Sequence, residues 1–141
     1  MEQADYSEAQ RGIERMLEKN RRYPRIAVNC PAEMIPDNGE VMRVTCYDIS
    51  SDGVQIHCPE AVTETVYVAG LGKQGGTGTR VHLRLSLTLN GEPADIKMMG
   101  RLVWKRKIGE GQFALGVQIT DIMGGSAVRL ERFIEESMRP P

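Results

Sequence analysis

The chain has 141 residues, of which 40% are hydrophobic and 26% charged, and this composition fits one globular domain with a core of its own. A formal net charge of −1 excludes the strong positive field that draws long nucleic acids to a protein. Three cysteines without CxxC spacing indicate reduced thiols, and the acidic, polar start lacks the pattern of a signal peptide. No apolar stretch approaches the roughly 18 residues of a membrane-spanning helix, so we expect a cytoplasmic protein without membrane insertion.

A charged helix followed by a basic arm is predicted at the N-terminus. Within residues 6–19, a narrow apolar stripe at helical spacing lies among alternating charges. Pro24 prevents the helix from continuing and favours extended geometry in the residue before it. We therefore predict a helical extension over residues 1–19 and a second unit over residues 20–141 that begins with a non-helical arm. The apolar stripe consists of Ile13, Met16 and Leu17.

From residue 25 onward, short β patterns dominate the sequence. The clearest is residues 81–89, where valine and leucine occupy every second position and polar residues the others. A helix with one apolar face is expected over residues 125–138. Many short strands separated by turn residues favour an antiparallel sheet or barrel over a parallel sheet. The other strand-like runs lie at 26–28, 41–46, 54–58, 65–69, 95–107 and 112–120.

The arm over residues 20–25, Asn-Arg-Arg-Tyr-Pro-Arg, is the first candidate binding element. Each guanidinium offers a planar fork of donors and keeps its charge. Such a group can grip a phosphate, bond bidentately to a guanine, or stack on a base. Taken alone, a basic stretch of this kind also fits the end of a helix, where cations are favoured.

The second candidate element is the turn over residues 48–53, Asp-Ile-Ser-Ser-Asp-Gly. A carboxylate such as Asp48 can accept two bonds from the N1–H and N2–H₂ edge of a guanine, and the hydroxyl of Ser50 can add another. Gly53 can adopt the positive φ that such turns often require. Taken alone, these residues also fit a plain turn between two strands.

Together the two elements resemble the PilZ-domain family. The resemblance lies in Arg-x-x-x-Arg (Arg21, Arg25) followed, one strand later, by Asp-x-Ser-x-x-Gly over residues 48–53. It continues in the predicted strands at 100–104 and 114–119 and in the C-terminal helix, and covers residues 20–138 in all. The sequence departs from the family at Gln118, where an aromatic residue is common, and in a Gly-rich insert at 70–79. Neither departure touches the motif residues.

The resemblance implies both a fold and a role. PilZ domains are six-stranded antiparallel barrels that bind cyclic di-GMP and pass the signal to a partner protein. The arginines would hold the phosphates and the Hoogsteen edges or faces of the guanines, while Asp48 and Ser50 would read a guanine edge. Gly53 would shape the turn, and Gly116 would allow close approach of the base. The ligand-binding residues so implied are Arg21, Arg22, Arg25, Asp48, Ser50, Gly53 and Gly116.

Three other site patterns are weak. Residues 70–75 match GxGxxG, but Gly and Thr follow where a dinucleotide-binding fold needs a helix. His57 and Cys58 are neighbours on a predicted strand and point to opposite faces, so they do not readily join Cys46 in a metal site. No cysteine or serine has a convincing base with an orienting acid. We therefore expect a protein that is not an enzyme and has no cofactor or metal.

Three competing functions remain open at this point. A protein–protein adaptor of the same fold would lack the nucleotide. A binder of single-stranded nucleic acid is disfavoured because aromatic residues make up only 5% of the chain. A hydrolase of the dinucleotide would need a metal or a cluster of general bases. The downstream partner, the oligomeric state and the choice between one ligand and an intercalated pair are also open.

Overall fold

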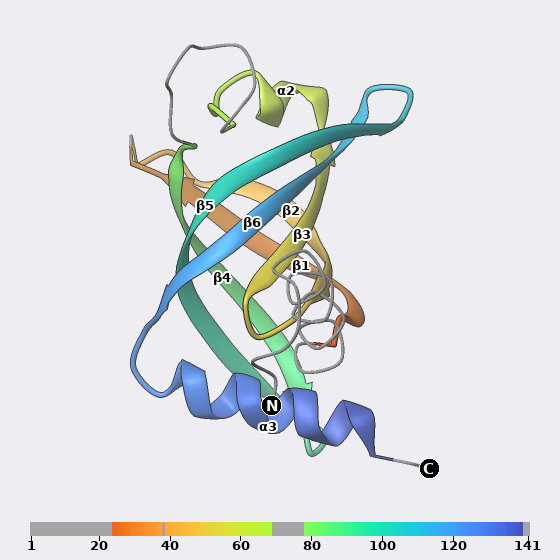
Figure 1. Cartoon of the computed structure of the whole chain (residues 1–141), viewed down its shortest axis with the longest axis vertical. Helices are drawn as coiled ribbons and strands as arrows, with labels where there is room; N and C mark the ends of the chain where they lie inside the picture. The colour runs from red at the N-terminus through yellow and green to blue at the C-terminus, as the bar shows by residue number, and fades with distance from the viewer. Residues whose placement is uncertain (1–23, 38, 69–77, 140–141) are drawn as a thin grey trace, which may run out of the picture.

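Strands make up most of the protein that the computed structural model describes, namely residues 24–37, 39–68 and 78–139 (Figure 1). The predicted helix over 6–19, Arg21, Arg22 and most of the Gly-rich insert lie outside these residues. The prediction of a mainly antiparallel β fold is confirmed. In chain order the elements are β1 (Ile26–Pro36), β2 (Met42–Ile49), β3 (Gly53–Pro59), α2 (Glu60–Thr63), β4 (Arg80–Leu89), β5 (Glu92–Gly109), β6 (Gln112–Ile122) and α3 (Ser126–Met138).

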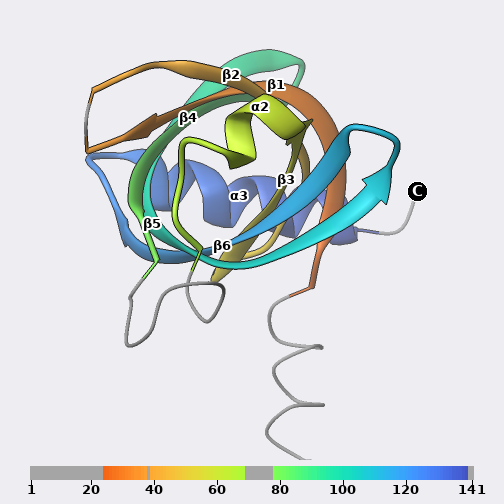
Figure 2. The ribbon, with the colours of Figure 1, turned by 90° about the horizontal axis from the view of Figure 1, so that it is seen from above.

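The strands form one closed antiparallel sheet in the order β1-β2-β3-β6-β5-β4. β1 pairs with β2 on one side and with β4 on the other, and this second pairing closes the ring. Figure 2 looks along the resulting barrel, with α2 at the near opening and α3 behind the far one. Closure pairs strand edges that would otherwise be exposed to other chains.

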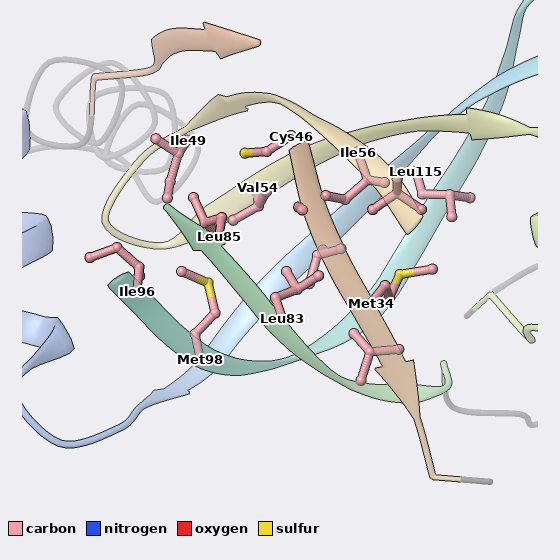
Figure 3. Close-up of a cluster of buried hydrophobic side chains, with 14 of the residues drawn as sticks. Met34, Cys46, Ile49, Val54, Ile56, Leu83, Leu85, Ile96, Met98 and Leu115 are labelled. Carbon is pink, nitrogen blue, oxygen red and sulfur yellow. The ribbon is translucent and has the colours of Figure 1, made fainter. Parts of the chain in front are cut away.

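Apolar side chains that alternate along the strands fill the barrel. On β4, Val81, Leu83, Leu85 and Leu87 are buried while the residues between them are half-buried or exposed, which confirms the predicted alternation. Figure 3 shows Leu83 among core side chains from the other strands. Each fully buried side chain of this size stabilises the fold by roughly 1.5–3 kcal/mol relative to an exposed one.

The prediction of a strand at residues 65–69 is wrong for residues 65–68, the part that the structure describes. Glu60–Thr63 form the short helix α2, and the chain then turns without entering a strand. The hydroxyls of Thr63 and Thr65 donate to the backbone carbonyls of Glu60 and Val62, at 2.7 and 2.8 Å. Threonine hydroxyls can bond the carbonyl three residues back, and here they stabilise a turn in place of a ladder.

Two further features complete the fold. Cys46 and Cys58 are buried in the core, as expected of small apolar residues, and Cys30 is half-buried. Within the described ranges, no helix is both long enough and apolar enough to cross a membrane.

Candidate functional site

The turn between β2 and β3 is held together by Ser50. Its backbone N–H donates to the carbonyl of Gly53 at 2.9 Å, and its hydroxyl donates to Asp52 Oδ1 at 2.7 Å. The N–H of Gly53 donates back to Ser50 Oγ at 3.2 Å. Ser50 is only 1% exposed, so its hydroxyl serves the turn in this conformation. Contact between the Ser50 hydroxyl and a guanine edge remains a prediction.

Gly53 is needed for a reason other than the one that its sequence context suggests. The expectation of a positive φ is wrong, since the glycines of the described residues with positive φ are Gly39, Gly91, Gly111 and Gly124. A Cβ on Gly53 would instead lie 3.2 Å from Arg25 Nη2 and 3.2 Å from the carbonyl of Val117. The missing side chain therefore lets the guanidinium of Arg25 lie directly against the turn.

A β-bulge in β2 sets the direction of Asp48. The register between β2 and β3 shifts between Cys46 and Asp48, so Tyr47 is an extra residue on β2. In a regular strand, Asp48 would point inward like the buried Cys46. The extra residue reverses the alternation. Ile49 is therefore fully buried, and the Asp48 carboxylate lies on the outer face beside Gln55.

An ion pair joins the end of the arm to β2. Arg25 Nη1 donates to Asp48 Oδ1 at 2.7 Å, while the other carboxylate oxygen, Oδ2, accepts from Gln55 Nε2 at 3.2 Å. The Arg25 side chain is 48% exposed and the Asp48 side chain 12%. A guanidinium has five N–H donors, so Arg25 can bond a ligand without releasing Asp48.

A hollow of about 300 Å³ adjoins this ion pair, between β3, β5 and β6. Arg25, Gly53, Trp104 and Gly116 contribute to its wall. An added Cβ on Gly116 would lie 2.0 Å from Trp104 Nε1, so the indole already occupies the space above this glycine. A base can lie directly over Gly116 in place of the indole only if Trp104 moves. Two larger hollows, of about 590 and 500 Å³, contain none of the predicted ligand-binding residues.

The structure therefore brings together part of the predicted site. Arg25, Asp48 and Gly53 are in contact, and Ser50 supports them from within the turn. Gln55, His57 and Trp104 lie beside this cluster but are not among the predicted ligand-binding residues. Gln55 and His57 share a face because they are two positions apart on β3, but only the bulge brings Asp48 to that face. Arg21 and Arg22 lie outside the described residues.

One family model and two solved structures of low sequence identity match the chain. The family model described as PilZ domain matches residues 19–136. The structure of the inhibitor of motility MotI/DgrA from Bacillus subtilis matches with a TM-score of 0.58 and 17% identity, over 84% of this chain and 52% of that one. The chain thus spans about half the length of that protein.

A second solved structure is the PilZ domain of YcgR from Escherichia coli with c-di-GMP. It matches with a TM-score of 0.51 and 18% identity, over 82% of this chain and 88% of that one. These identities show a shared fold alone, and a search of curated proteins found no match. Because the family model covers most of the sequence, including the Arg25–Asp48–Gly53 cluster, the chain belongs to the PilZ domain family.

Proposed function

We propose that this protein is a receptor for cyclic di-GMP that changes conformation on binding and signals to a partner protein. The observation that carries the proposal is the contact between the two motifs. Arg25 from the arm donates to Asp48 at 2.7 Å and lies against Gly53, although 23 positions separate the arginine from the aspartate in sequence. The YcgR domain, which shares this fold, was solved with c-di-GMP.

The chemistry of the cluster suits a dianionic dinucleotide with guanine bases. Arg25 supplies N–H donors for a phosphate or a Hoogsteen edge, and Asp48 supplies acceptors for the donor edge of a guanine. Arg21 and Arg22 precede Arg25 by only four and three positions. At about 3.3–3.6 Å per residue they can reach a ligand bound at the same turn.

In this proposal, the anionic ligand neutralises the arginines, and this neutralisation causes the conformational change. The ligand phosphates offset the repulsion within the cluster of Arg21, Arg22 and Arg25 and bridge the arm to the turn at 48–53. The existing Arg25–Asp48 pair need not break, because the Arg25 side chain is 48% exposed and its guanidinium has further N–H donors for the ligand. The arm and residues 6–19 before it then take one orientation relative to the barrel and present a new surface to a partner.

Isothermal titration with cyclic di-GMP tests the receptor proposal. We expect micromolar or tighter binding to the wild type, and a loss of about ten- to a hundredfold in Arg21→Ala and in Arg25→Ala. The reason is that a charge-assisted contact is worth roughly 1.5–3 kcal/mol. Arg84→Ala is the matched control, since Arg84 also forms a surface ion pair, with Glu33, away from the site.

The same titration separates the receptor from its nearest alternative. Absence of heat at high protein concentration, together with a melting temperature that the ligand leaves unchanged, would reject the receptor proposal. It would favour a PilZ-fold adaptor that binds proteins without the nucleotide. Equal losses in Arg25→Ala and Arg84→Ala would place the ligand elsewhere on the barrel.

A further inference from the structure

A chain of side-chain hydrogen bonds runs along the outer face of β3 and ends at Asp48. His57 Nε2 lies 2.9 Å from Gln55 Oε1, and Gln55 Nε2 donates to Asp48 Oδ2 at 3.2 Å. The other oxygen of the carboxylate accepts from Arg25. One oxygen is thus held by the arm and the other by β3, which determines how the plane of the carboxylate is turned.

The direction of each bond in this chain follows from the chemistry of the groups. Gln55 Oε1 can only accept, so His57 must donate from its Nε2–H. That bond keeps the amide NH₂ of Gln55 turned toward Asp48. With the amide reversed, Gln55 would point an oxygen at the carboxylate and leave the Nε2–H of His57 facing an NH₂ group. The carboxylate of Asp48 thus sets which end of Gln55 faces it, and the bond from His57 holds the amide in that orientation.

Stacking holds the ring of His57 in place. Its centroid lies 4.2 Å from that of Tyr47, with 11° between the two planes, and Tyr47 is the extra residue of the bulge. Burial lowers the pKa of His57 below its usual value, Asp48 opposes this shift and Arg106 adds to it. The ring is therefore neutral near pH 7, with its proton on Nε2.

We infer that Gln55 and His57 are positioning residues that hold the Asp48 carboxylate for the donor edge of guanine and so favour guanine over adenine in a cyclic dinucleotide. This inference rests on the proposed function. A carboxylate oxygen has two acceptor directions, so each oxygen of Asp48 keeps one after bonding Arg25 or Gln55. The parallel N1–H and N2–H₂ donors of guanine fit these two positions. Adenine presents an acceptor at N1 instead.

Titration of four variants with cyclic di-GMP and cyclic di-AMP tests this inference. Gln55→Leu removes the donor to Asp48, and His57→Phe keeps a ring on Tyr47 but removes the Nε2–H. We expect both to weaken cyclic di-GMP binding about three- to tenfold, as for loss of one neutral hydrogen bond, and to narrow the preference over cyclic di-AMP. His57→Gln, which restores an N–H donor at a similar reach, is expected to stay within about twofold of wild type.

His82→Phe is the matched control, because it makes the same change on β4, which does not neighbour β2 or β3. The inference is overturned if the wild type binds cyclic di-GMP and His57→Phe, His57→Gln and Gln55→Leu all match it in affinity and in base preference. If the wild type itself releases no heat, the receptor proposal fails, and the inference fails with it. Melting temperatures identify an unfolded variant, and if His57→Phe is unfolded, Gln55→Leu still decides the question because it removes the bond to Asp48 itself.

Discussion

At the scale of single residues, Gly116 shows that a glycine expected at a ligand site can be required for packing. The resemblance to PilZ domains led us to expect that a base approaches this position. Trp104 instead lies over the glycine, and Arg106 lies 5.3 Å from the centre of the indole ring. Ligand contact at Gly116 therefore remains a prediction, and a base stacked directly over this glycine would have to displace the indole.

Replacing this glycine tests the packing directly. In Gly116→Ala the new Cβ would lie 2.0 Å from Trp104 Nε1, so the ring must shift, at a cost of about 1–3 kcal/mol in unfolding free energy. We expect a lower melting temperature and a change in the fluorescence of Trp104, the single tryptophan of the chain. Gly109→Ala is the control, because its Cβ would lie 3.8 Å from the nearest atom. Equal melting temperatures for the two variants would contradict the packing role.

At the scale of elements, α3 is anchored to the barrel through its first residue. Ser126 is 1% exposed, and its hydroxyl accepts the backbone N–H of Lys97 on β5 at 2.9 Å. The apolar face predicted for this helix is only partly buried. Leu130 and Ile134 pack against the barrel, while Met138 is 56% exposed. The attachment thus depends on a polar contact as well as on apolar area.

Removing the Ser126 hydroxyl should loosen this attachment. In Ser126→Ala the N–H of Lys97 loses its acceptor, and loss of one such part-buried hydrogen bond costs about 0.5–1.5 kcal/mol. Urea denaturation should report a loss of this size. Ser137→Ala is the matched control, since the Ser137 hydroxyl is exposed and bonds within the helix, to Phe133. A loss no larger in Ser126→Ala than in Ser137→Ala would show that α3 is held by apolar packing alone.

Element types were predicted well where apolar and polar residues alternate over many positions, and poorly where side chains bond the backbone. Residues 81–89 alternate over a whole strand, so period alone predicts β4. Residues 65–69 contain β-branched side chains that also favour a strand. The threonine hydroxyls next to α2 bond local carbonyls instead, and composition does not reveal that competition.

At the scale of the whole molecule, the pairing of β1 with β2 places the candidate site where the chain enters the barrel. β1 pairs with β2, which positions Arg25, just before β1, next to Asp48 near the end of β2. A ligand that moves Arg25 therefore acts directly on the part of the chain that precedes β1. This arrangement suits a receptor that reports ligand binding through its N-terminal residues.

Hydrogen exchange tests that proposed coupling. With saturating cyclic di-GMP we expect slower exchange over residues 6–25, because the arm and the preceding segment take one orientation. Residues 81–89 serve as the internal reference, since β4 is paired on both sides in the barrel. Exchange over 6–25 that is unchanged by bound ligand would reject the mechanism while leaving the receptor proposal intact.

The sequence by itself determined the mainly β fold, the alternation of the strands and the two motifs, because all of these depend on the spacing of neighbouring residues. Only the tertiary structure decided that Asp48 points outward, that Gln55 links it to His57 by hydrogen bonds, and that Trp104 lies over Gly116. Each of these depends on the register between strands, and a bulge of one residue reverses which side chains face the core. That register is set by pairing across the whole barrel, which no local pattern contains.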